Sequence, residues 1–345
     1  MKVLLGLSGG VDSTYAALAL KDAGYEVVAA HLLMHGKMNA AEARESAAAL
    51  GIPLYEVDCR DRFSDIVIEN FINEYTTART PNPCVICNSE VKFIELLRLA
   101  DELGCEKIAT GHYASVERIE DSEGELYAIK RGKDSSKDQT YMLWRLPESV
   151  RKRLILPLSG ITKAEIRSES KERGLEAADR SDSQEICFIT EGDYADYLEE
   201  KRGKFPEGNF VYEDGSVAGR HKGIIRYTVG QRRGLGISAP TRLFVTGIDK
   251  EKNEVVISDK DPIFSEVTVS GIIYSGMREP KAGESRELSV KLRYAAKPKA
   301  ATVTFFGDKA TVKLHETERA VAPGQSCVMY DGDLLLAGGF IDSAK

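Results

Sequence analysis

The sequence lacks a hydrophobic run that could cross a bilayer, since no apolar stretch approaches the roughly 20 residues that a membrane-spanning helix needs. It also lacks internal repeats and low-complexity segments, which excludes a repeat architecture. The N-terminus enters directly into an apolar stretch typical of a strand, so we expect no signal peptide, no membrane association and a cytoplasmic protein. In that compartment the six cysteines are expected to serve as thiols, ligands or catalysts rather than as structural disulfides.

Two common nucleotide-binding signatures are missing as well. Residues 1–13 read MKVLLGLSGGVDS, with Val11-Asp12 where a Walker loop needs its lysine, and GxGxxG does not occur. Instead, an apolar strand runs into Gly9-Gly10 and then into an alanine-rich helix that ends near Lys21. This order directs several backbone N–H groups to one point, and the glycines let a phosphate approach closely. The stretch therefore predicts an anion site, with an ordinary glycine turn as the alternative.

Acidic residues outnumber basic ones, and the formal net charge of −7 alone disfavours binding to nucleic acid. The positive charge is segregated, however. No Asp or Glu occurs between Gly215 and Ile248 or between Leu288 and Gly307, and both stretches carry several Lys and Arg residues. Such segregation is typical of a phosphate-binding face, and a solvated charged face is the alternative for either stretch alone.

The first 190 residues alternate short apolar runs with amphipathic stretches. We expect strands at Val3–Leu5, Val27–Ala30, Leu54–Val57 and Lys107–Thr110, and helices at Ala40–Leu50, Phe63–Tyr75 and Val91–Leu103. This alternation predicts an α/β fold with a doubly wound parallel sheet, whose ligands lie beyond the carboxyl ends of its strands. Ser8–Ser13 and Gly111-His112 both follow such strand ends, so we expect them to face one crevice.

The composition changes near residue 200, where helical patterns stop. Lys201–Ser216 is rich in glycine and charge and is expected to be a loop. Short predicted strands then recur at Leu243–Ile248, Glu254–Ser258, Val267–Ile273, Glu287–Leu292, Thr302–Phe306, Ala310–Leu314, Ser326–Tyr330 and Leu334–Gly338. With a boundary at Asp261-Pro262, we predict an N-terminal domain at 1–200, a small central domain at 201–262 and a C-terminal β-barrel at 263–345.

Three of the six cysteines lie in surroundings that suggest chemistry. Cys84 and Cys87 follow two prolines and precede a predicted helix, and a helix N-terminus lowers a thiol pKa and favours the reactive thiolate. Cys187 lies in a loop that passes from polar to apolar residues. Cys59, Cys105 and Cys327 lack such surroundings and are expected to pack in the core.

Three interpretations of Cys84, Cys87 and Cys187 remain open. Structural zinc usually has four ligands, often as two CxxC pairs, and only one such pair is present. An iron–sulfur cluster can be held by three cysteines with one iron left open. A redox-active or persulfide-carrying pair needs only two thiols that can meet.

The stretch Ser8–Ser13, SGGVDS, resembles the pyrophosphate loop of the ATP α/β-cleaving family, whose fold is like that of the adenine nucleotide alpha hydrolases. Its members adenylate a carbonyl oxygen and release pyrophosphate. The resemblance implies that Asp12 holds Mg²⁺. It also implies ATP contacts from Gly6, Leu7, Ser8, Gly9, Gly10, Val11, Asp12 and Ser13.

Six further motifs run in order along the chain: TPNPCVICNSEVKF (80–93), TGHYA (110–114), KDQTYML (137–143), SDSQEICFI (181–189), GRHKGIIRYTVGQRRGLGI (219–237) and APGQS (322–326). Together they resemble the tRNA-specific 2-thiouridylases, which replace the C2 oxygen of the wobble uridine of tRNA with sulfur. The resemblance implies a pyrophosphate-loop domain, a small central tRNA-contacting domain and a C-terminal β-barrel. It further implies ATP-dependent adenylation followed by sulfur transfer, with AMP and pyrophosphate as products.

The same resemblance implies roles for individual residues. Cys187 would carry a persulfide, delivered by a sulfur-relay protein that a cysteine desulfurase feeds, and Cys87 would release the sulfur by disulfide exchange. Leu33, Met34 and Gly111 would border the adenosine. Contacts to tRNA would come from Asn82, Pro83, Cys84, His112, Lys137, Asp138, Gln139, Arg293, Tyr294 and Gln325, and the basic stretches with Arg232 and Arg233 would grip its phosphates.

The sequence departs from the family at two places. The Met34–Ala40 segment is shorter than the usual insertion there, and Cys84 stands where some members have Asp. Because Cys84 supplies a third cysteine, an iron–sulfur cluster that delivers sulfur to the same substrate remains an alternative. An alternative of another class is an RNA-binding protein whose nucleotide site regulates rather than catalyses.

Overall fold

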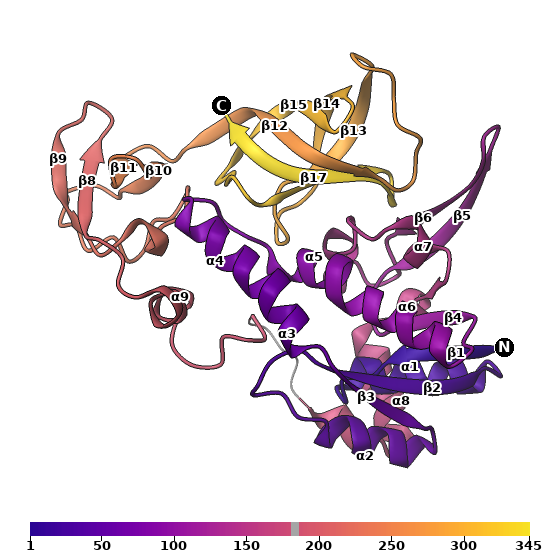
Figure 1. Cartoon of the computed structure of the whole chain (residues 1–345). Helices are drawn as coiled ribbons and strands as arrows, with labels where there is room; N and C mark the ends of the chain where they lie inside the picture. The colour runs from indigo at the N-terminus through magenta and orange to yellow at the C-terminus, as the bar shows by residue number, and fades with distance from the viewer. Residues whose placement is uncertain (181–185) are drawn as a thin grey trace.

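A computed structural model describes residues 1–180 and 186–345. Its N-terminal part is built on a five-stranded parallel sheet of order β3-β2-β1-β4-β7 (Figure 1). The strands are β1 (Lys2–Gly6), β2 (Glu26–Leu33), β3 (Leu54–Asp58), β4 (Lys107–Thr110) and β7 (Leu154–Ile155). No helix in the described ranges combines the length and the apolar character that crossing a membrane requires.

Helices cover both faces of this sheet, because successive apolar side chains of β1 point to opposite faces and all need to be buried. Val3 and Leu5 pack with α1 (Val11–Asp22), α2 (Ala41–Leu50) and α8 (Lys163–Glu172). Leu4 points to the other face and packs with Phe93 and Leu96 of α6 (Phe93–Glu102). Both faces are therefore buried in apolar side chains, which confirms the predicted doubly wound α/β fold.

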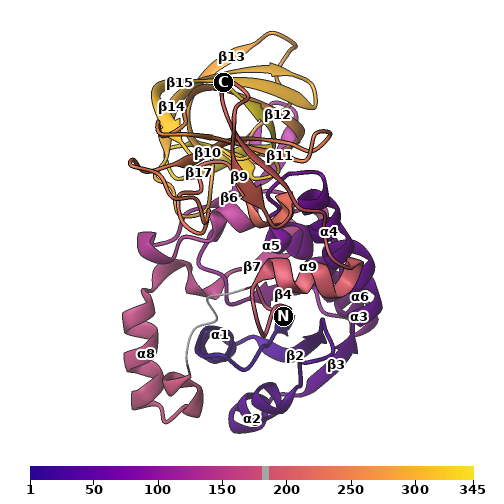
Figure 2. The ribbon, with the colours of Figure 1, turned by 90° about the vertical axis from the view of Figure 1, so that its left-hand side faces the viewer.

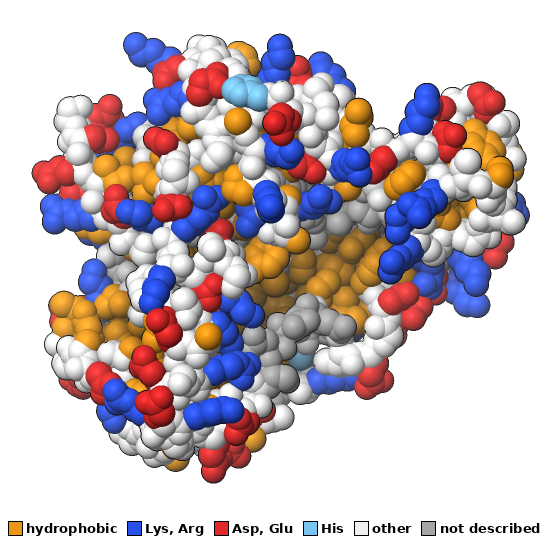
Figure 3. Space-filling model, turned by 180° about the vertical axis from the view of Figure 1, so that it is seen from behind, with side chains coloured by type: hydrophobic (Ala, Val, Ile, Leu, Met, Phe, Trp, Pro, Cys, Tyr) orange, Lys and Arg blue, Asp and Glu red, His pale blue; other side chains and the backbone are white. Residues whose placement is uncertain are grey.

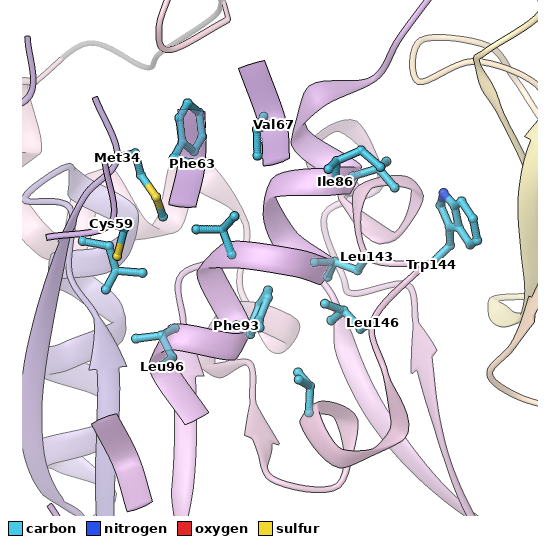
Figure 4. Close-up of a cluster of buried hydrophobic side chains, with 14 of the residues drawn as sticks. Met34, Cys59, Phe63, Val67, Ile86, Phe93, Leu96, Leu143, Trp144 and Leu146 are labelled. Atoms are coloured by element: carbon cyan, nitrogen blue, oxygen red, sulfur yellow. The ribbon is translucent and has the colours of Figure 1, made fainter. Parts of the chain in front are cut away.

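Two long helical segments contain a turn of π-helix. The predicted helix at Phe63–Tyr75 consists of α3 (Arg60–Phe63), the π-helix η1 (Ser64–Ile68) and α4 (Glu69–Thr76). The helix predicted from Val91 begins earlier, as α5 (Pro83–Ile86), the π-helix η2 (Cys87–Lys92) and α6. It begins there because proline suits the first helical position, where its missing N–H is not needed. Figure 4 shows the core beneath α6, where Phe93 lies near Leu143 and Leu146.

The segment that follows β4 forms a β-hairpin that we did not predict. It consists of β5 (Ser115–Asp121) and β6 (Gly124–Lys130). β5 carries charged residues without a clear apolar alternation, whereas Leu126, Ala128 and Ile129 of β6 are buried. β6 pairs with β17 at one position and so extends the sheet of the barrel. The remaining elements of this part are η3 (Ser135–Lys137), η4 (Thr140–Met142), α7 (Glu148–Arg151), η5 (Pro157–Gly160), η6 (Glu176–Asp179) and α9 (Tyr194–Arg202).

A small four-stranded sheet follows, with the order β10-β11-β8-β9. Its elements are β8 (Gly208–Tyr212), β9 (Val217–His221), η7 (Ile224–Arg226), β10 (Phe244–Asp249) and β11 (Glu254–Ser258). The prediction of a loop over Lys201–Ser216 is wrong for residues 208–212. These residues become a strand because they pair with β11 and because Phe210 is buried against Tyr227 and His221.

The C-terminal part is a closed six-stranded antiparallel barrel, as predicted. The strands follow the order β12-β15-β14-β13-β16-β17, and pairing between β12 and β17 closes the ring. They are β12 (Ile263–Tyr274), β13 (Ser285–Lys291), β14 (Lys299–Phe306), β15 (Lys309–Arg319), β16 (Ser326–Asp331) and β17 (Leu334–Ala344). Figure 2 shows the barrel above the α/β part.

Trp144 joins the barrel to the α/β part. Its indole N–H donates to Ser326 Oγ at 2.9 Å, and its ring meets Phe340 edge-on with the centroids 5.2 Å apart. A Cβ on Gly338 would lie 2.6 Å from this ring, so β17 can approach the indole only with glycine at that position. The two parts thus pack through a specific, fully buried contact.

Candidate active site

The turn between β1 and α1 is closed by the hydroxyl groups of its two serines. Ser8 Oγ and Ser13 Oγ lie 3.0 Å apart, and Ser13 Oγ also accepts from the Ser8 N–H at 3.2 Å. Gly9 has φ +92°, and a Cβ there would lie 2.5 Å from Glu42, so side chains are excluded on that side. The turn has the tight, side-chain-free backbone that close approach of a phosphate requires.

Asp12 lies at the start of α1, and both of its carboxylate oxygens are engaged. Lys163 Nζ donates to each of them at 2.7 Å, and the Tyr113 hydroxyl donates to Oδ1 at 2.5 Å. Lys163 is the first residue of α8, where a Thr162–Glu165 capping box fixes the helix start. This lysine is 8% exposed, so its charge is held in the crevice rather than in bulk water.

The sequence reasoning missed Lys163, although one signal was available. A lysine in the first turn of a helix is unfavourable, because the helix dipole is positive there. The Thr162–Glu165 capping pattern marks that helix start in the sequence. A cation placed against the dipole therefore indicated a role other than helix stability.

The end of β4 meets the same turn. A Cβ on Gly111 would lie 2.9 Å from the Asp12 carbonyl carbon and from the Ser13 nitrogen. Gln139, which we expected at tRNA, exchanges hydrogen bonds with Tyr113: its side chain accepts from the Tyr113 N–H at 2.9 Å, and its N–H donates to the Tyr113 carbonyl at 3.1 Å. Gly111 and the turn after β1 therefore lie against each other at the carboxyl ends of β4 and β1.

His112 points to the other side of this segment, toward α6. Its Nδ1 lies 2.8 Å from Thr110 Oγ1, and its ring centroid lies 5.8 Å from that of Phe93. Burial, together with the nearby Lys92 ammonium, lowers the pKa of His112 to about 3. His112 is therefore neutral near pH 7 and brings no positive charge to an RNA phosphate.

Cys84, Cys87 and Cys187 are brought into one electrostatic neighbourhood. Burial is the main cause of the raised pKa of Cys87 and Cys187; Cys84 adds to the rise in both, and Cys187 adds to the rise in Cys87. All three thiols are free, with Cys84 and Cys187 exposed and Cys87 half-buried. The other three cysteines, Cys59, Cys105 and Cys327, are buried, as predicted.

The predicted lowering of the thiol pKa values of Cys84 and Cys87 is wrong. Desolvation raises the pKa of Cys87 to about 12 and raises that of Cys84 above its ordinary value. Removal from water disfavours the charged thiolate, and this effect outweighs the start of the helix. The neighbouring Lys92 ammonium acts in the opposite direction on both thiols.

The iron–sulfur alternative does not fit the arrangement of side chains. Among the described residues, no group of three or more His, Cys, Asp or Glu is placed to hold a metal ion. The three thiols thus lie near one another without converging as a ligand set. The first five residues of the SDSQEICFI motif lie outside the described ranges, whereas Cys187 lies within them.

The loop before Cys84 is held by a turn of the barrel. Gln325 Nε2 donates to the carbonyls of Thr80 at 3.0 Å and Pro81 at 3.2 Å, and the Thr80 N–H donates to the Pro323 carbonyl at 2.7 Å. Asn82 and Pro83 are buried, and the Asn82 amide contacts Met142 Sδ at 3.4 Å. Gln325, expected at tRNA, thus positions the cysteine loop in this structure.

Asp138 is buried in the contact between the α/β part and the barrel. Its Oδ2 lies 3.4 Å from Arg131 and 3.7 Å from Lys291, and its Oδ1 accepts from the Thr140 N–H and hydroxyl. A carboxylate paired in this way links two parts of the protein and does not present itself to RNA. The preceding residue, Lys137, is half-buried.

Arg293 and Tyr294 lie just after β13, in the connection to β14. Arg293 pairs with Glu318 at 3.5 Å, and Tyr294 is 41% exposed beside the Lys291 ammonium, 5.4 Å from its ring centroid. Burial is the main cause of the raised pKa of Tyr294, and Asp138 and Cys84 add to it, so Tyr294 lies within electrostatic range of Cys84. An exposed aromatic ring at this position is suited to stacking on a base.

The adenosine contacts predicted from the resemblance are only partly placed. Leu33 is half-buried at the end of β2, whereas Met34 is buried in the core near Phe63 and Cys59 (Figure 4). The short segment after Met34 has a different contact. Lys37 Nζ donates to Thr190 Oγ1 at 2.7 Å and pairs with Glu191 at 3.0 Å, just beyond Cys187.

The basic stretch at 215–248 borders a large cavity. The cavity measures about 920 Å³, and residues of all three parts of the chain line it, among them Thr80, Arg220, Lys222, Arg293 and Gln325. Figure 3 shows a hollow face with an apolar floor and Lys and Arg side chains along its edges. Arg232 and Arg233 are exposed beside this region and form no ion pair within the described part of the chain.

Three family models cover nearly the whole chain. Residues 1–191 match the tRNA methyl transferase HUP domain, residues 195–259 the tRNA methyl transferase PRC-barrel domain, and residues 265–341 the aminomethyltransferase beta-barrel domain. A solved 4-thiouridine synthetase–RNA complex with bound ATP aligns over 58% of this chain and 50% of that chain, at 19% identity and a TM-score of 0.37. That likeness is too slight to bear on function.

Curated relatives match at much higher identity. The tRNA-specific 2-thiouridylase MnmA of Geobacter metallireducens is 41% identical over 364 residues, which cover 99% of this chain and 97% of the relative. The enzyme of the same name from Clostridium botulinum strain Alaska E43 is 41% identical over 358 residues, with 99% and 98% covered. With such identity along almost its entire length, the chain belongs to the tRNA-specific 2-thiouridylase family.

Proposed function

We propose that this protein is a tRNA-specific 2-thiouridylase, which adenylates the C2 oxygen of the wobble uridine of tRNA and then replaces that oxygen with sulfur. One observation carries this proposal: the segment after β4 touches both halves of the site. Gly111 and Tyr113 contact the turn that carries Asp12, whereas His112 lies near Lys92, whose charge acts on the cysteines. A nucleotide at that turn and a sulfur on a cysteine can therefore meet on one base.

In the first step the C2 oxygen attacks the α-phosphorus of ATP, and the bond to pyrophosphate breaks. The backbone N–H groups near Gly9-Gly10 and the Lys163 ammonium offset the charge that develops on the leaving pyrophosphate. Asp12 holds that ammonium in place through both of its oxygens. Because both oxygens are already engaged, this donor set does not fit the predicted magnesium site, and no step here depends on one.

In the second step the terminal sulfur of a Cys187 persulfide attacks C2 as an anion, and AMP leaves with the oxygen. The Cys87 thiolate then attacks Cys187 Sγ, which breaks the bond between Cys187 Sγ and the transferred sulfur. The transferred sulfur stays on C2, and a Cys87–Cys187 disulfide forms. A dithiol reductant supplies the two electrons and two protons that restore the thiols.

A cysteine that receives sulfur from another protein must be accessible, and Cys187 is exposed. A sulfur-relay protein or a cysteine desulfurase is therefore a fitting donor, and the six free thiols suit a reducing cytoplasm. The anticodon loop is single-stranded, so its bases can enter the site without the cost of opening a duplex. Basic side chains around the cavity would hold the phosphates on either side.

The experiment is a single-turnover reaction with transcribed tRNA that carries a wobble uridine, ATP, a persulfide-loaded protein and a thiol reductant. We expect one AMP for each 2-thiouridine, identified by mass spectrometry of the nucleosides, and none of either with a tRNA whose wobble base is cytidine. Formation of 4-thiouridine, or release of AMP without any thiolated base, would contradict the proposal. Iron analysis of anaerobically purified protein tests the cluster route separately, with no stoichiometric iron expected.

A further inference from the structure

Lys92 occupies an unusual position relative to Cys87. The two residues are the last and the first of the π-helix η2. In a π-helix the hydrogen bonds span five residues, so residues five apart stack on one face, whereas in an α-helix they would point in different directions. Burial raises the pKa of the Cys87 thiol, and a hydrogen bond from the backbone N–H of Lys92 opposes that rise, so the sulfur lies beside this turn. The π-helix thus places Lys92 on the same helix face as Cys87.

The Lys92 ammonium is not neutralised by a carboxylate of the described residues. The acids near it along the helix are engaged with arginines: Glu90 pairs with Arg145, and Glu95 pairs with both Arg62 and Arg98. Lys92 is half-buried, so its charge is only partly screened by water. A positive charge therefore remains available to the groups around it.

The titratable groups around Lys92 are the thiols of Cys84, Cys87 and Cys187 and the neutral imidazole of His112. Lys92 favours the thiolate form of Cys84, Cys87 and Cys187 against the desolvation that disfavours it. His112 is the other titratable group in range, and it is uncharged near neutral pH. For Cys84, Lys92 is the one charge opposing desolvation in the described part of the chain.

We propose that Lys92 is a positioning residue whose ammonium stabilises the sulfur anions of the site, first the persulfide of Cys187 and then the thiolate of Cys87. This inference rests on the proposed function, which requires both anions. Without the ammonium, a larger share of both sulfurs would stay in the neutral form, which attacks poorly. Lys92 forms no bond with substrate in this scheme and acts only through the two cysteines.

The test compares Lys92→Met and Lys92→Arg with wild-type protein, and Lys152→Met, an exposed lysine of the same part of the chain, is the matched control. The rate of iodoacetamide alkylation of Cys87 and Cys187 is followed against pH by peptide mass spectrometry, without tRNA or ATP. For Lys92→Met we expect the alkylation rate at pH 7.5 to fall about tenfold, which corresponds to a rise of about one unit in the thiol pKa. Lys92→Arg and Lys152→Met should keep the wild-type profile.

An unchanged alkylation rate at pH 7.5 in Lys92→Met would overturn the inference. Since this readout involves no tRNA, it stands or falls independently of the proposed thiolation. Transfer of sulfur to tRNA should fall in parallel, whereas AMP formation should persist. If Lys92→Met fails to fold, wild-type protein provides the test. The ratio of the alkylation rate with anionic iodoacetate to that with neutral iodoacetamide should be higher at low salt than at 1 M salt, because salt screens the ammonium. A ratio that does not depend on salt would overturn the inference.

Discussion

Lys163 Nζ lies 2.7 Å from both carboxylate oxygens of Asp12, although the two residues are 151 positions apart in the chain. The pair joins the start of α1 to the start of α8 beside the carboxyl end of β1. Both helix starts are unfavourable places for a cation, so the carboxylate is what retains the ammonium there. A phosphate that enters the turn would meet a positive charge already held in place.

We expect Lys163→Met to lower the rate of AMP formation by about 10²- to 10³-fold, the loss typical of removing one preorganised electrostatic contact in a transition state. The measurement is tRNA-dependent AMP release under single-turnover conditions. Lys171→Met is the matched control, because Lys171 lies on the same helix in an exposed pair with Asp179. Equal rates for Lys163→Met and Lys171→Met would remove Lys163 from the adenylation step.

Gly111→Ala should damage the same step without removing any charge. The added Cβ would lie 2.9 Å from backbone atoms of Asp12 and Ser13, which can give way only by moving the turn. We expect a loss of stability of about 1–3 kcal/mol, as for other overpacked sites, together with loss of AMP formation. Urea denaturation and the AMP assay measure the two effects. Gly160→Ala is the control, since nothing lies within 4 Å of that Cβ, and similar behaviour of the two variants would show that the turn tolerates the displacement.

His112 should make the stability depend on pH. Its pKa is about 3 in the folded protein and near 6.5 in the unfolded chain, so below pH 6.5 the unfolded chain binds a proton that the folded protein does not. Stability contributed by this group is therefore present above pH 6.5 and is lost as the pH falls toward 3, by up to about 1.4 kcal/mol per pH unit.

The measurement is the free energy of unfolding of wild type and His112→Gln between pH 4.5 and 7. We expect the wild-type curve to be steeper, by about 1 kcal/mol per pH unit. His35 and His221 also have lowered pKa values, but they remain in both proteins and cancel in the comparison. Parallel curves would mean that His112 is as well solvated in the folded protein as in the unfolded chain.

Arg232 and Arg233 should contribute to tRNA affinity through phosphates. Each phosphate contact adds about 0.7–0.9 to the slope of log affinity against log salt, so the double change to alanine should reduce that slope by up to about 2. Filter binding at several salt concentrations measures it. Lys250→Ala with Lys252→Ala is the control, because these lysines pair with Glu251 and Asp249 in the turn between β10 and β11. A slope unaltered by loss of the two arginines would place them away from the RNA.

The parts of the fold that sequence could predict are those fixed by neighbouring residues. The strand, glycine turn and helix of residues 1–22 follow from local apolar runs and breakers, and β1 and α1 lie within a residue of their predicted bounds. β8 could not be foreseen, because Gly208–Tyr212 reads as a loop until β11 pairs with it. The hairpin of β5 and β6 was missed for a similar reason, since β5 has no buried residue and carries little apolar signal.

The site divides in the same way. The turn at Ser8–Ser13 and the cysteines are visible as motifs, whereas the partner of Asp12 is brought there only by the folding of the sheet. The predicted shift in the pKa of Cys87 had the wrong direction. A helix start is a local feature of the sequence, whereas burial depends on atoms from distant segments. Motifs thus identify the reactive groups, whereas the protonation states of these groups depend on their burial and neighbours in the folded protein.

The contact of Trp144 with Ser326 and Phe340 has a practical consequence, since the chain contains only one tryptophan. All intrinsic indole fluorescence therefore originates at the seam between the α/β part and the barrel. Any reorientation of the barrel when RNA binds would change the polarity around that indole and shift its emission. The protein carries its own optical reporter of that rearrangement, and no label has to be introduced.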